Sequence, residues 1–238
     1  MSMNKSTATI IGGSLIAGLA VLGFLLGDAA VKFRALDRSV TVKGLAEREV
    51  PADIVIWPIQ FTTASNDLSK LYVAIEESFQ KIGTFLAEQG IKEREITVST
   101  PAITDKSAQA YGNNVRAEFR YTAKQTVTVY SKDIANVHKA MRALSTLGKQ
   151  GIVFSGNDYQ ATTEYLFTQL NDLKPKMIEE ATRKARAVAQ KFAEDSESKL
   201  GKIKKAKQGQ FSISPRDKNN PHIKKIRVVS TVEYYLSD

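Results

Sequence analysis

An uncharged apolar segment near the N-terminus limits the possible structures of this chain more than any other feature. Residues Ala8 to Leu26, ATIIGGSLIAGLAVLGFLL, contain no charged side chain and lie between Lys5 and Asp28. A helix needs roughly 20 apolar residues to cross the hydrocarbon core of a membrane, whereas a cleavable signal peptide has a shorter apolar core of about 7–15 residues. No polar face interrupts the segment, which argues against a buried helix of a soluble protein. We therefore expect residues 1–31 to form a membrane anchor that crosses the bilayer through residues 8–26.

Cleavage and orientation of this anchor stay open. Gly27 and Ala29 provide small residues for a cleavage site, so a cleaved signal peptide is the alternative to a retained anchor. More basic residues follow the segment than precede it, which by the positive-inside rule favours a cytoplasmic body. Long domains translocate largely regardless of their charge, however, and a short N-terminal tail is typical of an export signal. We therefore expect the body to be exported.

The remaining residues predict one folded domain. After a linker at residues 32–38, segments of period two alternate with segments whose apolar residues lie three and four apart, which indicate strands and helices respectively. Helices are expected to begin near residues 67, 133 and 172. The expected strands cover residues 39–48, 54–63, 96–103, 116–130, 152–167, 203–213 and 226–236. The order β-β-α-β-β-α-β-α-β-β predicts an α+β domain over residues 39–238, with three helices packed on a mostly antiparallel sheet.

Three prolines and one polar segment refine this outline. Pro58 and Pro101 cannot donate a ladder hydrogen bond, so each predicts an edge position or a bulge. Pro175 is tolerated in the first turn of a helix, which agrees with a helix that starts near Asp172. The segment at residues 105–114, DKSAQAYGNN, is expected to form an exposed loop.

The residue types that most often carry catalysis or bind metals are scarce in this chain. Cysteine is absent, which excludes disulfides, thiolate metal sites and cysteine nucleophiles. Only His138 and His222 supply imidazole. The motifs GxxxxGK[ST], GxGxxG, GxSxG and HExxH are absent as well. We expect His138 on the surface of a helix or half-buried, and His222 in solvent. The sequence therefore predicts no catalytic residue, no cofactor and no metal site.

The net charge of +9 is concentrated in one segment. Residues Lys199 to Arg227 contain ten lysines or arginines and a single acid, Asp217. We expect a hairpin here that either remains solvated, with lysines that discourage edge-to-edge pairing, or binds an anionic lipid or envelope polymer. Nucleic acid is not an expected partner, because Phe211 is the sole aromatic residue of the segment. The possible surface for an anionic partner consists of Lys202, Lys204, Lys205, Lys207, Lys224 and Lys225.

Five segments of the body resemble the SIMPL-domain family, which includes bacterial periplasmic and oxidative-stress-defence proteins. Gly44, Pro51 and Asp53 match the family's opening strands most clearly, although Ala52 stands as an insertion and Trp57–Pro58 departs from the family's pattern. The five segments are VTVKGLAEREVPADIVIWPIQF (40–61), AIEESFQKIGTFLAEQGIKEREITVST (74–100), YTAKQTVTVYSKDIANV (121–137), EATRKARAVAQKFAEDSESKLGKI (180–203) and VVSTVEYYL (228–236).

The resemblance implies an α+β fold, export to the periplasm or cell surface, and large homo-oligomers in some members, and it implies no catalytic residue. We therefore expect a non-enzymatic envelope protein, anchored in the inner membrane with its body in the periplasm, that self-assembles and is linked to stress defence. Cleavage of the anchor would instead leave a soluble periplasmic protein. One alternative is a binding module whose basic 199–227 hairpin engages anionic lipid or envelope polymer. The other is an enzyme with an unrecognised carboxylate site.

Overall fold

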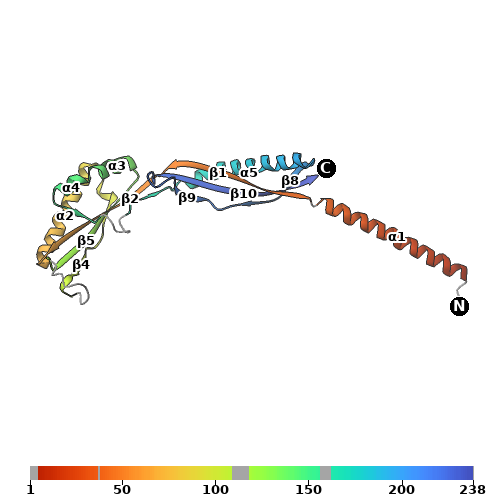
Figure 1. Cartoon of the computed structure of the whole chain (residues 1–238), viewed down its shortest axis with the longest axis horizontal. Coiled ribbons are helices and arrows are strands. Elements are labelled where there is room, and N and C mark those ends of the chain that lie inside the picture. Colours follow the sequence, from red (N-terminus) through yellow and green to blue (C-terminus); the bar gives the residue numbers. More distant parts are fainter. Residues whose placement is uncertain (1–4, 37, 109–117, 156–161, 238) are drawn as a thin grey trace. The chain divides into compact units, whose positions relative to one another are not determined.

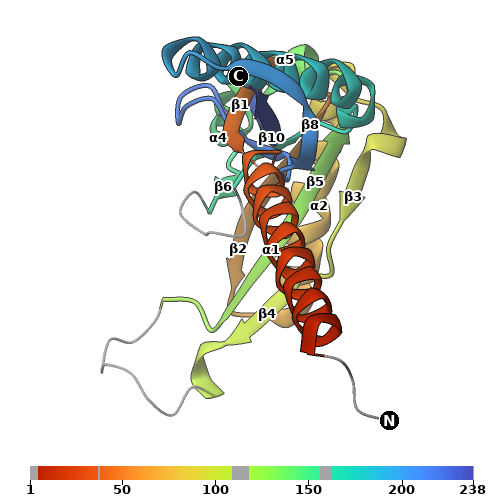
Figure 2. The same ribbon diagram turned by 90° about the vertical axis from the view of Figure 1, so that its right-hand side faces the viewer.

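The computed structural model describes residues 5–36, 38–108, 118–155 and 162–237 (Figures 1 and 2). The α+β class is confirmed, with helices and antiparallel sheets. The chain groups into two compact units, each built from segments that lie far apart in the sequence. Unit 1 contains residues 1–47, 174–212 and 227–238, and unit 2 contains residues 48–173 and 213–226. The strands form two sheets instead of the one expected.

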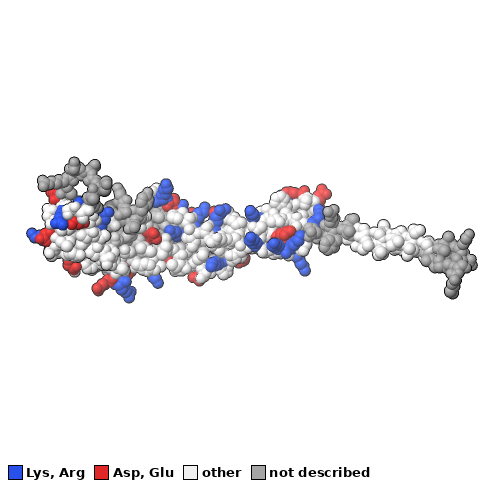
Figure 3. Space-filling view, turned by 90° about the horizontal axis from the view of Figure 1, so that it is seen from below, with Lys and Arg blue, Asp and Glu red and all other residues white. Residues whose placement is uncertain are grey.

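The N-terminal helix α1 covers Lys5–Leu36. Its window Gly12–Ala29 has a mean hydropathy of 1.6 and no buried residue, so it is long and apolar enough to cross a membrane. Figure 3 shows an uncharged white surface along this part of the chain. The helix continues through most of the segment expected as a linker at 32–38, because residues 32–36 include neither a glycine nor a proline that would stop it.

The first sheet has the strand order β1-β10-β8, so β8 lies at an edge. Strand β1 covers Ser39–Pro51, β8 covers Lys199–Gln208 and β10 covers Ile223–Ser237. Strand β8 runs antiparallel to β10, with irregular register around Tyr234. The short strand β9, Ser212–Pro215, also pairs with β10.

The basic segment expected as one hairpin is thus divided among three strands. Strand β8 ends before Gly209, whose N–H donates to the Val229 carbonyl at 2.8 Å. A Cβ added at Gly209 would lie 2.5 Å from the same carbonyl oxygen, so the chain passes too close to β10 there for a side chain. The strand expected at 203–213 is therefore interrupted, and the chain resumes pairing as β9.

Helix α5, Leu170–Asp195, packs on the first sheet through small side chains (Figure 1). Ala185 and Ala189 share a core cluster with Val42 of β1 and with Val232 and Tyr234 of β10. The buried residues of α5 recur every four positions, and they are Met177, Ala181, Ala185, Ala189 and Ala193. A face of small residues lets the helix backbone approach the sheet closely.

Gly44 of β1 lies at the closest point of this packing. A Cβ added there would lie 2.5 Å from the Ala185 backbone nitrogen and would overlap the Ala181 carbonyl oxygen. Because both neighbours are backbone atoms, they cannot rotate away, and only glycine fits between β1 and α5 at this position.

The second sheet has six strands, with β2 (Ile54–Ser65) and β5 (Tyr121–Ser131) at its centre. These two strands pair antiparallel along their length, from Val55 opposite Ser131 to Ser65 opposite Tyr121. Strand β5 therefore begins later than the strand expected from residue 116, and residues 116 and 117 lie outside the described residues.

Short strands complete this sheet on both sides. Strands β3 (Ile96–Val98) and β4 (Ala102–Asp105) pair with β5, and the 3-10 turn η1 (Glu93–Glu95) precedes β3. Strands β6 (Val153–Phe154) and β7 (Glu164–Leu166) pair with the other side of β2. Only these two short strands occur within the described part of the strand expected at 152–167.

Helix α2, Leu68–Glu88, covers the second sheet and contacts both β2 and β5 (Figure 2). It begins where the sequence predicts, because the Asp67 carboxylate accepts the Lys70 N–H at 3.0 Å and caps the first turn. The three- and four-residue spacing of the apolar residues predicts that Leu68 and Tyr72 are buried as well, but both are exposed because they lie beside the face that meets the sheet. The buried residues of α2 are Leu71, Ile75, Ile82, Phe85 and Leu86.

Two other helices differ from the sequence prediction. The single helix expected after Asp133 is divided into α3 (Ile134–Ala143) and α4 (Ser145–Lys149). Between them the Leu144 N–H donates to the carbonyl three residues back, at 3.3 Å, which tightens the chain as in a 3-10 helix. Helix α5 begins at Leu170, two residues before Asp172, so Pro175 lies in its second turn instead of its first.

The structure contradicts the prediction made from one strand proline and confirms the prediction made from the other. Strand β2 is central and pairs with β5 without a bulge, so the edge position or bulge expected from Pro58 is wrong. Pro58 lies between the residues that pair with β7 and those that pair with β6, so β2 has no outer partner there among the described residues. At Pro101 the prediction is confirmed, because the register against β5 shifts by one residue between β3 and β4. The turn η2 (Lys106–Ala108) follows, and the rest of the loop expected at 105–114 lies outside the described residues.

Candidate functional site

Four of the six candidate lysines lie on the edge strand β8, and they are Lys202, Lys204, Lys205 and Lys207. Lys204 is half-buried and the other three are exposed. Lys205 and Lys207 lie opposite Glu233 and Thr231 of β10, which places both lysines on one face of the sheet. The strand therefore presents both an unpaired backbone edge and positive charge.

Acidic neighbours offset part of this charge. The Lys204 Nζ lies 3.4 Å from a Glu233 carboxylate oxygen. A hydrogen bond from the Ser39 hydroxyl and the charge of Lys204 lower the pKa of Glu233 below its ordinary value. Lys202 and Lys207 make no ion pair within the part of the chain that the structure describes. On the face drawn in Figure 3, basic and acidic side chains are interspersed rather than gathered in one basic area.

Lys224 and Lys225 lie elsewhere, at the start of β10 in unit 2. The Lys224 side chain is 8% exposed, and its burial lowers the pKa of the ammonium, an effect that the charge of Glu164 opposes. Lys225 is half-buried. The structure therefore does not bring the six lysines into one unit, and Lys224 has little area to offer an anionic partner.

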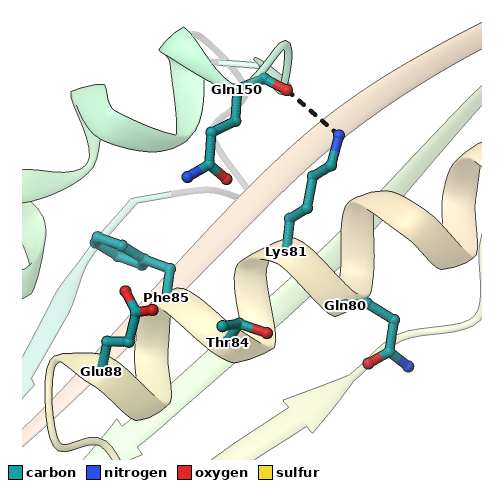
Figure 4. A pocket seen from close by; sticks show the side chains of 6 residues that line it. All are labelled: Gln80, Lys81, Thr84, Phe85, Glu88 and Gln150. Carbon is teal, nitrogen blue, oxygen red and sulfur yellow. Dashed lines mark hydrogen bonds between the residues drawn. The ribbon is translucent and has the colours of Figure 1, made fainter.

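Three surface hollows lie among the described residues of unit 2, and none of them brings together a set of catalytic groups. One of about 230 Å³ lies between α2 and the end of α4 (Figure 4). The Lys81 ammonium in it donates to the backbone carbonyl of Gln150 at 3.4 Å and points away from the Glu88 carboxylate. Sites for small molecules usually measure about 300–1,000 Å³. A larger hollow of about 470 Å³ beside α2 has Glu93 as its one carboxylate.

Asp53 holds the start of helix α5. One of its carboxylate oxygens accepts the Thr168 N–H at 2.7 Å, the Thr168 hydroxyl at 2.9 Å and the Gln169 N–H at 3.2 Å. Thr168 and Gln169 directly precede α5, so these hydrogen bonds fix the chain where the helix begins, and an anionic oxygen near a helix N-terminus is stabilising. The same carboxylate lines a hollow of about 310 Å³ with Asp172. Its contacts give Asp53 a role in positioning the chain rather than in chemistry.

The two histidines of the chain lie together in unit 2. The ring centres of His138 and His222 are 5.1 Å apart, and the ring of Tyr165 lies 5.6 Å from the first and 6.0 Å from the second. The His138 Nε2 and the Tyr165 hydroxyl form a hydrogen bond of 2.8 Å. His222 is half-buried against these rings, so the expectation that it lies in solvent is wrong. Sequence reasoning missed this cluster, because nothing local signals which turn will meet which helix.

Three different elements place these rings. Helix α3 carries His138, strand β7 carries Tyr165, and the turn before β10 carries His222, whose carbonyl accepts the Ala52 N–H at 2.8 Å. Burial, with the nearby His222 and Arg142, lowers the pKa of His138. Burial also raises the pKa of Tyr165. The His138 imidazole and the Tyr165 phenol are therefore both uncharged at neutral pH.

Comparison with known proteins identifies the body of the chain. The family model described as SIMPL, Protein of unknown function (DUF541), matches residues 40–233. The chain belongs to the SIMPL family. The matched residues run from β1 to β10 and exclude α1. No curated protein matches the chain.

Within the SIMPL domain, the residues that carry the family resemblance have structural roles. Gly44 allows the close approach of β1 to α5, and Asp53 holds the residues that precede α5. Pro51 ends β1. These residues therefore account for the fold shared with the family and assign no reaction to the protein.

Proposed function

We propose that this SIMPL protein is a non-enzymatic, membrane-anchored protein of the bacterial envelope, whose body lies in the periplasm, self-assembles and supports stress defence. Helix α1 is the observation that carries the proposal. The family membership and the hollows of unit 2, which gather no reactive constellation among the described residues, agree with a role other than catalysis.

The dimensions of α1 favour a retained anchor. The apolar window of 18 residues spans about 27 Å at 1.5 Å per residue, close to the roughly 30 Å of a membrane's hydrocarbon core. Large apolar side chains in the window are exposed, such as Phe24 at 76% and Ile16 at 71%. Such a surface is costly in water and stable in lipid.

Fractionation of cells that make the full chain tests the anchor. We expect the protein in the membrane pellet after washing with high salt, and in solution only after detergent. Leu22→Arg places a charge within the window, which costs about 2.5–3.5 kcal/mol at a bilayer centre, and should shift protein into the soluble fraction. Val73→Arg on α2 is the matched control, because Val73 is similarly exposed. Full-length protein in the soluble fraction would contradict the anchor, and a mature N-terminus beyond Ala29 would show cleavage.

An exposed apolar pair on unit 1 supports self-assembly. Val188 and Phe192 of α5 are 42% and 55% exposed and lie four residues apart, so they are neighbours on one flank of the buried stripe. Light scattering of the full chain in detergent should give a protein mass that is a multiple of 26.2 kDa. Phe192→Ser should lower the mass and Lys191→Ser should not. A monomeric wild-type protein would refute self-assembly.

The stress role has its own test. A strain that lacks the protein should be more sensitive to an oxidant than its parent, and the wild-type gene should restore tolerance. Equal sensitivity of the two strains would remove stress defence from the proposal and leave the anchor and assembly untouched.

A binding module is the second candidate function, and the exposed lysines on one face of β8 favour it. The full chain in detergent should bind beads that carry dextran sulfate at low salt, and replacing the four β8 lysines with glutamine should weaken this binding. A control variant removes the same charge from helices of unit 2 through glutamine at Lys70, Lys81, Lys139 and Lys149. Equal binding by both variants would refute a role specific to β8.

A further inference from the structure

We propose that His138, His222 and Tyr165 form a binding site for a divalent transition-metal ion, with Cu²⁺ bound more tightly than Zn²⁺. The whole imidazole content of the chain meets at this one place, from two elements that are distant in the sequence. A tyrosine hydroxyl completes a set of two nitrogen donors and one oxygen donor.

The spacing of the histidine rings suits a shared ion. A metal–nitrogen bond of about 2.0–2.1 Å puts each imidazole centre roughly 3.1 Å from the ion, so two ligands at a tetrahedral angle have centres about 5 Å apart. The observed separation of His138 and His222 is 5.1 Å. The edge-to-face arrangement, with an angle of 86° between the ring planes, keeps the two rings from stacking against each other.

The position of Tyr165 agrees with the same geometry. A phenolate oxygen about 2.0 Å from the ion puts the ring centre roughly 4.2 Å away, and hence about 6 Å from each histidine centre. The observed separations are 5.6 and 6.0 Å. The His138 Nε2 and the Tyr165 oxygen already converge at 2.8 Å, whereas two donors on one tetrahedral ion lie roughly 3.3 Å apart. A small outward movement of these two atoms therefore makes room for the ion.

The donor set selects the class of ion. Imidazole suits Zn²⁺ and Cu²⁺, and hard ions such as Mg²⁺ and Ca²⁺ prefer a shell of oxygens. A site with these donors follows the general order of affinities, in which Cu²⁺ exceeds Zn²⁺. On binding, the Tyr165 phenol gives its proton to solvent and its oxygen donates a lone pair to the ion. The histidines are half-buried, which leaves the ion a route from solvent.

No group of three or more His, Asp or Glu residues suited to a metal occurs in the described parts of the chain, so the site depends on its tyrosine. This dependence makes the proposal specific, because a phenolate bound to Cu²⁺ gives a visible charge-transfer band and a histidine-only site does not.

Titration of the full chain in detergent with CuCl₂ tests the site, without a histidine tag. We expect one equivalent of Cu²⁺ per chain and a visible phenolate band, with ZnCl₂ as a weaker competitor. Loss of a residue that only hydrogen-bonds a metal ligand lowers metal affinity by about 10–100-fold. His138 and His222 are proposed as direct ligands, so His138→Asn and His222→Asn should each weaken Cu²⁺ binding by more than about 100-fold. Tyr165→Phe should abolish the band, and Tyr130→Phe on the exposed side of β5 should retain it.

Circular dichroism of each variant without metal shows whether it is folded. Cu²⁺ binding of equal strength in the wild-type protein and in the folded His222→Asn or His138→Asn variant would overturn the site. A band that persists in folded Tyr165→Phe would overturn the role of the phenolate. Zn²⁺ that binds as tightly as Cu²⁺ would overturn the stated preference.

Discussion

Gly44→Ala tests the close approach of β1 to α5. The added Cβ would lie 2.5 Å from the Ala185 nitrogen and would overlap the Ala181 carbonyl oxygen, whereas ordinary contact begins near 3.4 Å. Neither backbone atom can rotate away, so strand and helix have to separate by more than about 1 Å, and a gap of about 1 Å already forfeits up to half of the dispersion energy of the facing atoms.

The expected loss of unfolding free energy in Gly44→Ala follows from this geometry. Overpacking substitutions cost about 1–3 kcal/mol, and we expect about 3 kcal/mol here because the partners are backbone. At roughly 4–8 °C per kcal/mol for a unit of about 100 residues, the Tm of unit 1 should fall by about 12–24 °C.

Thermal unfolding of the full chain in detergent, followed by circular dichroism, measures the effect. Trp57 is the one tryptophan and is buried in unit 2, so its fluorescence follows the other unit. Gly83→Ala is the control, because no atom lies within 4 Å of its added Cβ, and we expect a gain of up to about 1 kcal/mol for this helical position. A Gly44→Ala protein with the wild-type transition would refute the close contact.

Two other substitutions test single carboxylates, with Trp57 fluorescence as the measure of unfolding. Asp53→Ala should destabilise unit 2 by about 0.5–2 kcal/mol, as loss of a helix-start acceptor does, and an unchanged urea midpoint would contradict its role at α5. Hydrogen bonds from the Lys92 N–H and the Ser131 hydroxyl lower the pKa of Glu95 from 4.5. As the pH falls, the Glu95 carboxylate of the unfolded chain is therefore protonated before that of the folded chain. The stabilisation by Glu95 is complete above about pH 4.5 and is lost as the pH falls toward the lower folded pKa. Glu95→Gln should flatten this part of the curve of unfolding free energy against pH, and an equal slope in both proteins would contradict the argument.

Local patterns in the sequence predicted much of the fold. The cap at Asp67 and the apolar spacing of α2 are encoded in adjacent turns, so the start and most of the buried face of that helix were predictable. Alternation predicted β1 and β10 for the same reason. Pro101 predicted a bulge correctly, because the loss of a donor acts where the residue lies.

Features that depend on distant segments were not predictable in this way. Pro58 is compatible with a central strand because the described strands β6 and β7 pair with the residues on either side of it and not with Pro58 itself, and nothing near Pro58 encodes that arrangement. The division of the strands between two sheets depends on which strand pairs with β10, over large separations in the sequence. The meeting of His138 with His222 likewise required the turn before β10 to be placed beside α3.

The alanine face of α5 has a consequence for how this protein tolerates mutation. Alanine has the smallest side chain after glycine, so almost every substitution at Ala181, Ala185 or Ala189 enlarges a site that has no spare volume. Exposed positions such as Val188 and Phe192 have no such restriction from the sheet. A scan of all substitutions along α5 should therefore show intolerance that repeats every four residues, and the variation that natural selection can draw on in this helix should be confined to its outer face.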